Sequence, residues 1–230
     1  MTARTASTRA ESGRAAASID AVILAPAGTQ LSVLLARSPA KSRERWQLPW
    51  RALRLDETID REASRLARKT LGSTPALVEQ VAAFGDGRRH PSGAALSVAF
   101  LALVDAKTGT VMDDAGEASW FAVDDLPALP PRQRGMLEGA LTSLRTRLEQ
   151  GPIAFHLLPP TFTLTQLQDI YELLLGRRLH KASFRRSLHA AWLVEPTDEW
   201  RSEGRGRPAQ LFRYAPKKRR GGRRGVRFGG

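Results

Sequence analysis

Charged side chains that could do chemistry are concentrated in the stretch Leu48–Gly72, LPWRALRLDETIDREASRLARKTLG. Carboxylates in such a segment could hold a hard divalent cation, which needs oxygen ligands and a negative field, and arginines could hold phosphates. The same charges also fit the two ends of a helix. Asp60 and Glu62 fall in a predicted first turn, and Arg68 and Lys69 fall in a predicted last turn, where the helix dipole favours each sign.

The uncharged residues of this stretch follow the period of one helical face. Apolar or small residues recur at steps of three and four, at Ile59, Ala63, Leu66, Ala67 and Thr70. Gly72 follows them and can end the helix, because glycine adopts the left-handed conformation without strain. We therefore expect a loop that leads into an amphipathic helix.

Three residues of the stretch also resemble the Nudix box, the loop and helix that hold Mg²⁺ in hydrolases of nucleoside diphosphates linked to another group. Glu57, Arg65 and Gly72 stand at the spacing of that pattern. In the resembled family, the glutamate that Glu57 matches usually braces the loop by pairing with the arginine that Arg65 matches. The resemblance therefore implies that the shape of the loop is kept.

The metal-binding positions of the resembled family are not acidic in this chain. Leu66, Lys69 and Thr70 replace its three glutamates, and Arg51 replaces its opening glycine. Metal-assisted attack on a pyrophosphate needs an ion that activates water and neutralises developing charge, and Lys69 would repel it. We expect no metal site, no catalytic residue and no cofactor, so that the chain is not an enzyme. The alternative is a Mg²⁺-dependent Nudix hydrolase of ADP-ribose-like substrates with a nucleic-acid-binding appendage.

The bulk composition favours a cytoplasmic bacterial protein. A chain of 230 residues with 42% hydrophobic residues can bury one large or two medium cores. It has no cysteine, which excludes disulfides and thiolate zinc sites. It also has no run of 18 apolar residues, so we expect no membrane span.

Positive charge is concentrated at the carboxyl end. Residues 201–230 hold eleven Lys or Arg and one acid, Glu203, so that +10 of the formal net charge of +13 lies there and the first 200 residues carry +3. Such an imbalance favours a module that meets phosphates. A merely solubilising tail is the alternative.

The order of predicted elements before residue 150 indicates an α/β sandwich with a mixed sheet. The expected strands and helix are Ser18–Pro26, Leu31–Ala36, Ala76–Phe84, Leu96–Val104, Glu117–Val123 and Pro131–Glu149. WQLP at Trp46–Pro49 is similar to the usual approach to a Nudix box. The segment Phe84–Val104 resembles the matching segment of Nudix-related transcriptional regulators, the NrtR family, so that a Nudix-like α/β/α fold is implied.

The segment after residue 160 has the pattern of a winged helix-turn-helix. Helices are expected at Phe162–Leu175, with Thr165 as N-cap and Gln168 as its capping-box partner, and at Lys181–Trp192, with Gly176 breaking the chain between them. Strands are expected at Leu193–Pro196 and Ala209–Tyr214, with a basic wing tip between them. A protein-binding module is the alternative. The strings FTLTQLQ, FRR and GRGRPAQLFRY also resemble the winged helix of the same regulators.

Taken together, these features predict a DNA-binding transcriptional regulator that acts as a repressor and binds double-stranded DNA as a homodimer. The resemblance implies a nucleotide-sugar effector such as ADP-ribose, and control of NAD metabolism. The expected effector-binding residues are Arg37, Trp46, Arg51, Phe84, Arg88 and Arg89. The expected DNA-binding residues are Thr163, Thr165, Lys181, Ser183, Arg185, Arg186, Arg205 and Arg207. The expected domains are a disordered leader (1–17), the Nudix-like domain (18–150), a linker (151–161), the winged helix (162–215) and a basic disordered tail (216–230).

Overall fold

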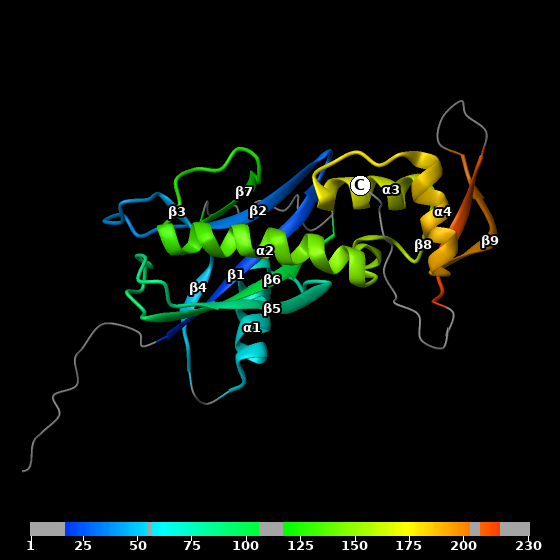
Figure 1. The fold of residues 1–230 in the computed structure, drawn as a ribbon. Coiled ribbons are helices and arrows are strands. Elements are labelled where there is room, and N and C mark those ends of the chain that lie inside the picture. Colours follow the sequence, from blue (N-terminus) through cyan, green and yellow to red (C-terminus); the bar gives the residue numbers. More distant parts are fainter. Residues whose placement is uncertain (1–16, 55–56, 106–116, 203–207, 217–230) are drawn as a thin grey trace, which may run out of the picture.

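The computed structural model describes residues 17–54, 57–105, 117–202 and 208–216, and Figure 1 shows their fold. The expected leader, apart from Ala17, and the expected tail, apart from Pro216, lie outside the described residues. The wing-tip arginines Arg205 and Arg207 lie outside them too. No helix in the described part of the chain is both long and apolar enough to cross a membrane.

The amino-terminal part is built on a mixed sheet of seven described strands. Its main order is β3-β2-β1-β6-β5, while β4 pairs with β1 and β7 pairs with β2. β1 and β6 are parallel, and the other pairs are antiparallel. The strands are β1 (Ala17–Ala27), β2 (Gln30–Arg37), β3 (Trp46–Gln47), β4 (Trp50–Ala52), β5 (Leu77–Phe84), β6 (Leu96–Leu103) and β7 (Ala118–Ala122).

Two helices, α1 (Ile59–Leu71) and α2 (Pro131–Gln150), cover opposite faces of this sheet, as Figure 1 shows. Successive side chains of a strand point to opposite faces, so β1 contributes to both apolar cores. Its residues in the core beside α1 are Ile19, Ala21, Ile23 and Ala25, and its residues in the core beside α2 are Val22 and Leu24. The fold is therefore the expected α/β/α sandwich.

Helix α1 begins and ends where its sequence predicts. The Thr58 hydroxyl accepts a hydrogen bond from the Arg61 backbone N–H at 3.4 Å and caps the first turn. Gly72 has φ 69° and donates its N–H to the Arg68 carbonyl oxygen. Leu66 is 8% exposed and packs on the sheet, and burial of a leucine side chain stabilises a fold by about 1.5–3 kcal/mol.

The carboxyl-terminal part consists of two helices and a small sheet of order β8-β10-β9. Its elements are η2 (Ile153–Leu157), β8 (Thr161–Phe162), α3 (Leu164–Leu175), α4 (Lys181–Ala191), β9 (Val194–Arg201) and β10 (Ala209–Tyr214). Strand β9 extends five residues beyond the expected Pro196. The two helices and the β9–β10 hairpin form a helix-turn-helix with a wing, as expected.

The N-cap of α3 is Thr163, and the prediction of Thr165 was wrong. Thr163 accepts a hydrogen bond from the Gln166 N–H at 3.1 Å, and the Gln166 side chain accepts one from the Thr163 N–H at 2.9 Å, which completes a capping box. Thr165 and Gln168 have the same spacing in sequence. The choice is made by tertiary pairing, because Phe162 is held extended in β8 opposite Phe212, and the helix begins directly after it.

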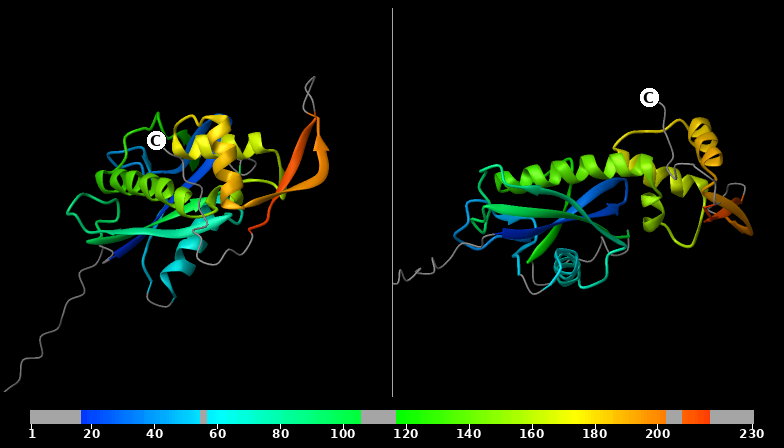
Figure 2. Two further views of the ribbon diagram at one scale, coloured as in Figure 1. Left: turned by 45° about the vertical axis from the view of Figure 1, so that its right-hand side comes forward. Right: turned by 60° about the horizontal axis from the view of Figure 1, so that its bottom comes forward.

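One apolar core runs through both parts of the molecule. It joins β1 and α2 to residues of α3 and α4 that include Leu167, Tyr171 and Phe184. Three residues of η2 are buried in it, namely Ile153, Ala154 and Leu157. The segment that we expected to be a linker thus packs between the two parts, and both views of Figure 2 show the carboxyl-terminal part at the carboxyl end of α2. The domain boundaries themselves stay a prediction.

Candidate functional site

Helix α4 carries its apolar and its basic residues on separate faces. Phe184 and Leu188 are buried, and the ring of Phe184 packs edge-on against Tyr171 with centroids 5.5 Å apart. The expected DNA-contacting residues on this helix, Lys181, Ser183, Arg185 and Arg186, are all exposed. This arrangement suits a recognition helix, whose amino-terminal residues meet base edges in the major groove.

The turn between α3 and α4 is fixed by the buried carboxylate of Glu172. It accepts hydrogen bonds from the Gln168 side chain at 2.8 Å, from the Leu179 N–H at 3.0 Å and from Arg178 at 2.8 Å. Burial would raise the pKa of Glu172, but these hydrogen bonds and the charge of Arg178 hold it below its ordinary value. The carboxylate therefore ties Arg178 and Leu179 of the turn to α3.

The two threonines that we expected to contact DNA have different environments. Thr163 is 3% exposed, and its hydroxyl is used by the α3 cap. Its side chain therefore stabilises the helix, and a direct phosphate contact by it does not fit this geometry. Thr165 is exposed in the first turn of α3, where backbone N–H groups and a hydroxyl can meet a phosphate.

The wing is tied to the first turn of α3. Arg201, the last residue of β9, donates a hydrogen bond to the Gln166 side chain at 3.3 Å. Glu195 and Arg213 form an ion pair between the two strands. Trp200 is 57% exposed, two residues before the last described residue of this side of the hairpin. The expected contacts Arg205 and Arg207 follow outside the described residues.

Three of the expected effector-binding residues belong to β2, β3 and the β5–β6 loop, and Figure 1 shows β3 on the side of the molecule opposite α4. Arg37 and Trp46 pair directly across β2 and β3, with the Arg37 guanidinium 5.6 Å from the Trp46 ring centroid. Arg89 forms an ion pair with Glu44, which joins the β5–β6 loop to the β2–β3 loop. An aromatic ring among guanidinium groups can hold a base and its phosphates.

Phe84 and Arg88 lie along α2 instead. A Cβ atom placed on Gly139 would come within 3.2 Å of the Phe84 ring, and one placed on Gly135 would come within 3.3 Å of the Arg88 guanidinium. The two glycines therefore let β5 and its loop approach the helix closely. Arg88 also pairs with Asp86 at 3.4 Å.

Arg51 does not join these residues, so its assignment to the effector site is not supported by the geometry. It lies on β4 opposite Ile19, which belongs to the core beside α1. Its guanidinium is 2.8 Å from a carboxylate oxygen of Glu62 in α1. Arg51 thus faces the opposite side of the sheet from Trp46 and Phe84, which pack with the core beside α2.

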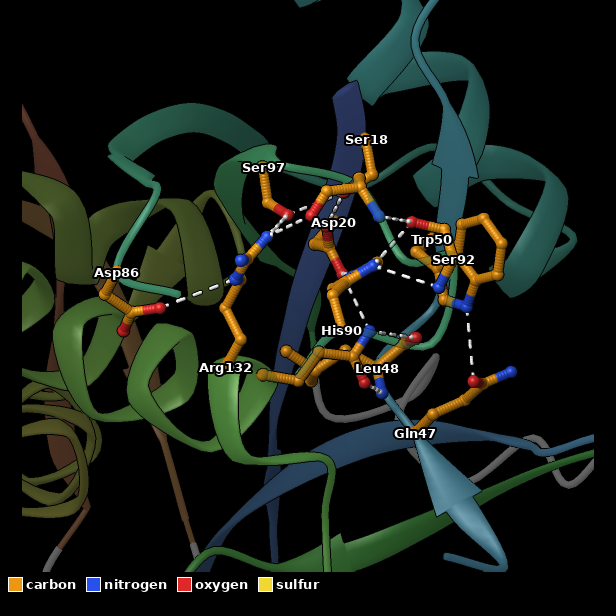
Figure 3. Close-up of polar contacts among 12 residues, drawn as sticks. Ser18, Asp20, Gln47, Leu48, Trp50, Asp86, His90, Ser92, Ser97 and Arg132 are labelled. Atoms are coloured by element: carbon orange, nitrogen blue, oxygen red, sulfur yellow. Dashed lines mark hydrogen bonds and ion pairs between the residues drawn. The ribbon is translucent and has the colours of Figure 1, made fainter. Parts of the chain in front are cut away.

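A buried polar network that the sequence did not predict lies between the start of β1, the β5–β6 loop and the first turn of α2, as Figure 3 shows. Asp20, fully buried, accepts hydrogen bonds from Gln133 at 2.7 Å and from Ser18 at 2.9 Å, and lies 2.8 Å from His90. Arg132 binds the Ala94 carbonyl oxygen at 2.6 Å. The network anchors the loop that carries Arg88 and Arg89.

The hydrogen bonds of His90 indicate which tautomer its neutral ring adopts. Its Nδ1 accepts the Ser92 backbone N–H at 3.2 Å, so the ring proton of the neutral form sits on Nε2 and is donated to Asp20. A charged residue inside the apolar run of β1 was the sequence signal for this network, because a buried carboxylate needs partners. His90 is therefore a packed histidine, 3% exposed.

A cavity of about 470 Å³ opens where the two parts of the molecule meet. It lies between the β1–β2 turn, the carboxyl half of α2 and the turn after α3. Burial and the charge of Glu172 raise the pKa of Asp169 in its wall above the ordinary value. At this cavity, the turn between α3 and α4 faces the β1–β2 turn of the Nudix-like sheet.

The loop and helix that resemble a Nudix box do not fit a divalent cation. Glu57 and Arg65 form the ion pair that the resemblance implied. Leu66 is buried, and the Thr70 hydroxyl is donated to the Leu66 carbonyl oxygen at 2.9 Å. Across the described ranges, no three His, Cys, Asp or Glu side chains lie together as a metal site requires. The loop–helix ion pair is kept, while Leu66 and Thr70 offer no carboxylate at the positions where Mg²⁺ needs oxygen ligands.

Comparison with known proteins connects both parts to one family. The family model of the NrtR DNA-binding winged helix domain matches residues 154–214. The chain is 32% identical over 203 residues to the ADPR responsive transcriptional repressor NtrR of Acinetobacter baylyi. The aligned region covers 86% of this chain and 81% of that protein.

Solved structures agree in fold. The chain is similar to Shewanella oneidensis NrtR complexed with a 27mer DNA, with a TM-score of 0.73 and 27% identity over 86% of this chain and 93% of that one. It also has the fold of a MutT/nudix family protein from Enterococcus faecalis, with a TM-score of 0.70 and 19% identity over 89% of each chain. With a Nudix-like sandwich joined to this winged helix, the chain belongs to the NrtR family of transcriptional regulators.

Proposed function

We propose that this protein is a DNA-binding transcriptional repressor whose Nudix-like domain senses ADP-ribose or a related nucleotide-sugar. The exposed basic face of α4 is the observation that carries the DNA-binding half. The similarity to an ADPR responsive repressor supports the sensing half. The Nudix-like part and the winged helix share one apolar core and a cavity, so effector binding to the first can change the arrangement of the second.

The DNA contacts that we propose are those of the helix-turn-helix and wing. Exposed side chains of α4 would enter the major groove, and Thr165 would meet a phosphate. Arg205 and Arg207 at the wing tip would reach the minor groove or the backbone. A homodimer would place two such modules on a palindromic operator, and genes of NAD metabolism are the proposed targets. A regulator of this kind acts in the bacterial cytoplasm and on the nucleoid.

The effector contacts that we propose are the residues around the β2–β3 and β5–β6 loops. Arg37, Arg88 and Arg89 would pair with phosphates, while Trp46 and Phe84 would pack near the base or support the site. The buried network under His90 would hold the β5–β6 loop in place. Arg51 is left out because its guanidinium is committed to Glu62.

The same proposal excludes hydrolysis of the effector. Leu66, Lys69 and Thr70 provide no carboxylate to hold a cation at the pyrophosphate. The ligand would therefore act by preferring one arrangement of the protein over another, and not by being cleaved.

Selection of preferred duplexes from a random pool, with and without ADP-ribose, tests the proposed function. We expect one palindromic sequence to be enriched, and its enrichment to change when ADP-ribose is added. A protein truncated after residue 215 should enrich the same sequence, because the winged helix carries the specificity. Equal recovery of all sequences at physiological salt would contradict DNA-specific regulation.

Product analysis of ADP-ribose incubated with the protein and Mg²⁺ tests the absence of hydrolysis. We expect the ligand to be recovered intact. Turnover that disappears in a Glu57→Ala variant would show instead that the domain is a hydrolase.

A further inference from the structure

The carboxylate of Glu62 is the most deeply buried acid of the Nudix-like loop and helix. Its side chain is fully buried in α1. A buried carboxylate is stable only with cationic or hydrogen-bonding partners, because it has lost its hydration. The partners of Glu62 therefore determine whether the loop and helix can hold together.

Two arginines lie within ion-pair distance of this carboxylate, although Glu62 Oε2 accepts no hydrogen bond from any described residue. The Arg51 guanidinium lies 2.8 Å from Glu62 Oε2, and the Arg65 guanidinium lies 3.4 Å from Glu62 Oε1. Arg65 in turn pairs with Glu57 in the loop before α1. The result is a row of alternating charges that joins β4, α1 and the loop between them.

Strand β4 explains how Arg51 reaches α1. Arg51 pairs with Ile19 of β1, and both point to the face of the sheet that α1 covers. The neighbouring Trp50 points to the other face, where its ring packs edge-on against His90. A glycine at position 51, as in the resembled Nudix pattern, would leave Glu62 with Arg65 alone.

We propose that the guanidinium of Arg51 provides inside this domain the positive charge that a divalent cation provides on the loop and helix of Nudix hydrolases. Arg51 makes the domain metal-independent, and loss of its charge creates a demand for a cation at Glu62 and Glu57. Glu57 Oε2 and Glu62 Oε2 are both buried and have no hydrogen-bond partner among the described residues, and both carboxylates contact Arg65, so each has an oxygen left for a cation. The inference rests on one part of the proposed function, namely that the Nudix-like domain binds its effector without using a metal ion.

Thermal unfolding of the full chain, first freed of metal and then with millimolar Mg²⁺ or Mn²⁺, tests this proposal. Arg51→Gln keeps most of the side-chain volume without the charge, and should lower the Tm by on the order of 10 °C in the absence of metal. Addition of Mn²⁺ should restore about half of that loss. Neither cation should change the Tm of the unsubstituted protein.

Three further variants control the experiment. Arg51→Lys keeps a positive charge, and Arg68→Ala removes an exposed arginine of α1. Both should stay within about 3 °C of the unsubstituted protein and respond to neither cation. The double variant Arg51→Gln with Glu62→Gln replaces the buried carboxylate by a neutral amide, which needs no positive partner. It should be more stable than Arg51→Gln alone and insensitive to metal.

The proposal is overturned if the Tm of Arg51→Gln ignores both cations, or if the unsubstituted protein is stabilised by them to the same extent. If Arg51→Gln does not fold with or without metal, the double variant decides: a folded, metal-insensitive protein supports the proposal, and an unfolded one overturns it. No DNA or ADP-ribose is present in the measurement, so its failure is distinct from failure of the proposed repressor function.

Discussion

Helices α1 and α4 are both amphipathic and both carry arginines on an exposed face, but they use them differently. Arg65 of α1 is paired with Glu57 and Glu62. Arg185 and Arg186 of α4 form no ion pair with any described residue, and α4 contains no acidic residue. The difference shows that an arginine serves the fold where a carboxylate lies within reach, and stays available for a phosphate where none does.

The largest expected effect is a loss of stability, and it compares a substitution in the core beneath α4 with one in the core beneath α1. Phe184→Ala should lower the free energy of unfolding by about 3–5 kcal/mol, because it leaves a cavity in the core that both parts share. Denaturant unfolding measures this loss. Leu66→Ala, in the core beside α1, is the matched variant and should also lose stability, but it should keep DNA binding while folded. Equal loss of DNA binding by both folded variants would contradict the separate roles.

The next effect is a loss of DNA affinity, and it compares an exposed arginine of α4 with one of α1. Arg186→Ala should weaken binding to the selected duplex by about 1–3 kcal/mol if the guanidinium contacts a base edge, as measured by titration of labelled DNA. Arg61→Ala on the exposed side of α1 is the matched control and should leave affinity unchanged. A loss of similar size in Arg61→Ala would show that α1 also contacts DNA.

A smaller effect concerns the Glu172 carboxylate, which accepts hydrogen bonds from the turn between α3 and α4. The pKa of Glu172 is lowered in the fold by its hydrogen bonds and by Arg178, so its contribution to stability is present above its ordinary pKa and is lost as the pH falls through the lowered value. Glu172→Gln should cost about 1–2 kcal/mol near neutral pH. It should also flatten the acid side of a stability–pH curve, and an unchanged acid limb would refute this role of the carboxylate.

The smallest effect separates the two threonines of α3. Thr163→Ala removes the helix cap and should cost about 1 kcal/mol of stability. Thr165→Ala should leave the Tm unchanged and only weaken DNA binding, with a smaller dependence on salt if a phosphate contact is lost. If Thr165→Ala is the destabilised variant in calorimetry, the cap assignment is wrong.

Local patterns in the sequence were sufficient for most elements. The end of α1 at Gly72, the Gly176 turn and the separation of apolar from basic residues on α4 depend on neighbours within a few positions, so the period and caps predict them. The capping box of α3 was misplaced by two residues, because two threonines had a glutamine at the right spacing and only the pairing of Phe162 with Phe212 excludes one of them.

The sequence by itself determined the Nudix-like frame, in which Leu66, Lys69 and Thr70 stand where the resemblance places glutamates, and the basic winged helix that follows it. Only the tertiary structure decided which charged residues form ion pairs within the protein. Arg51 and Arg89 look alike in sequence, but the pairing of β4 with β1 turns Arg51 towards Glu62, while Arg89 meets Glu44 at the far end of the sheet. Asp20 and His90, 70 positions apart, meet only because the β5–β6 loop folds over β1. Contacts of this kind depend on which strands are neighbours, and side-chain periodicity carries no information about that.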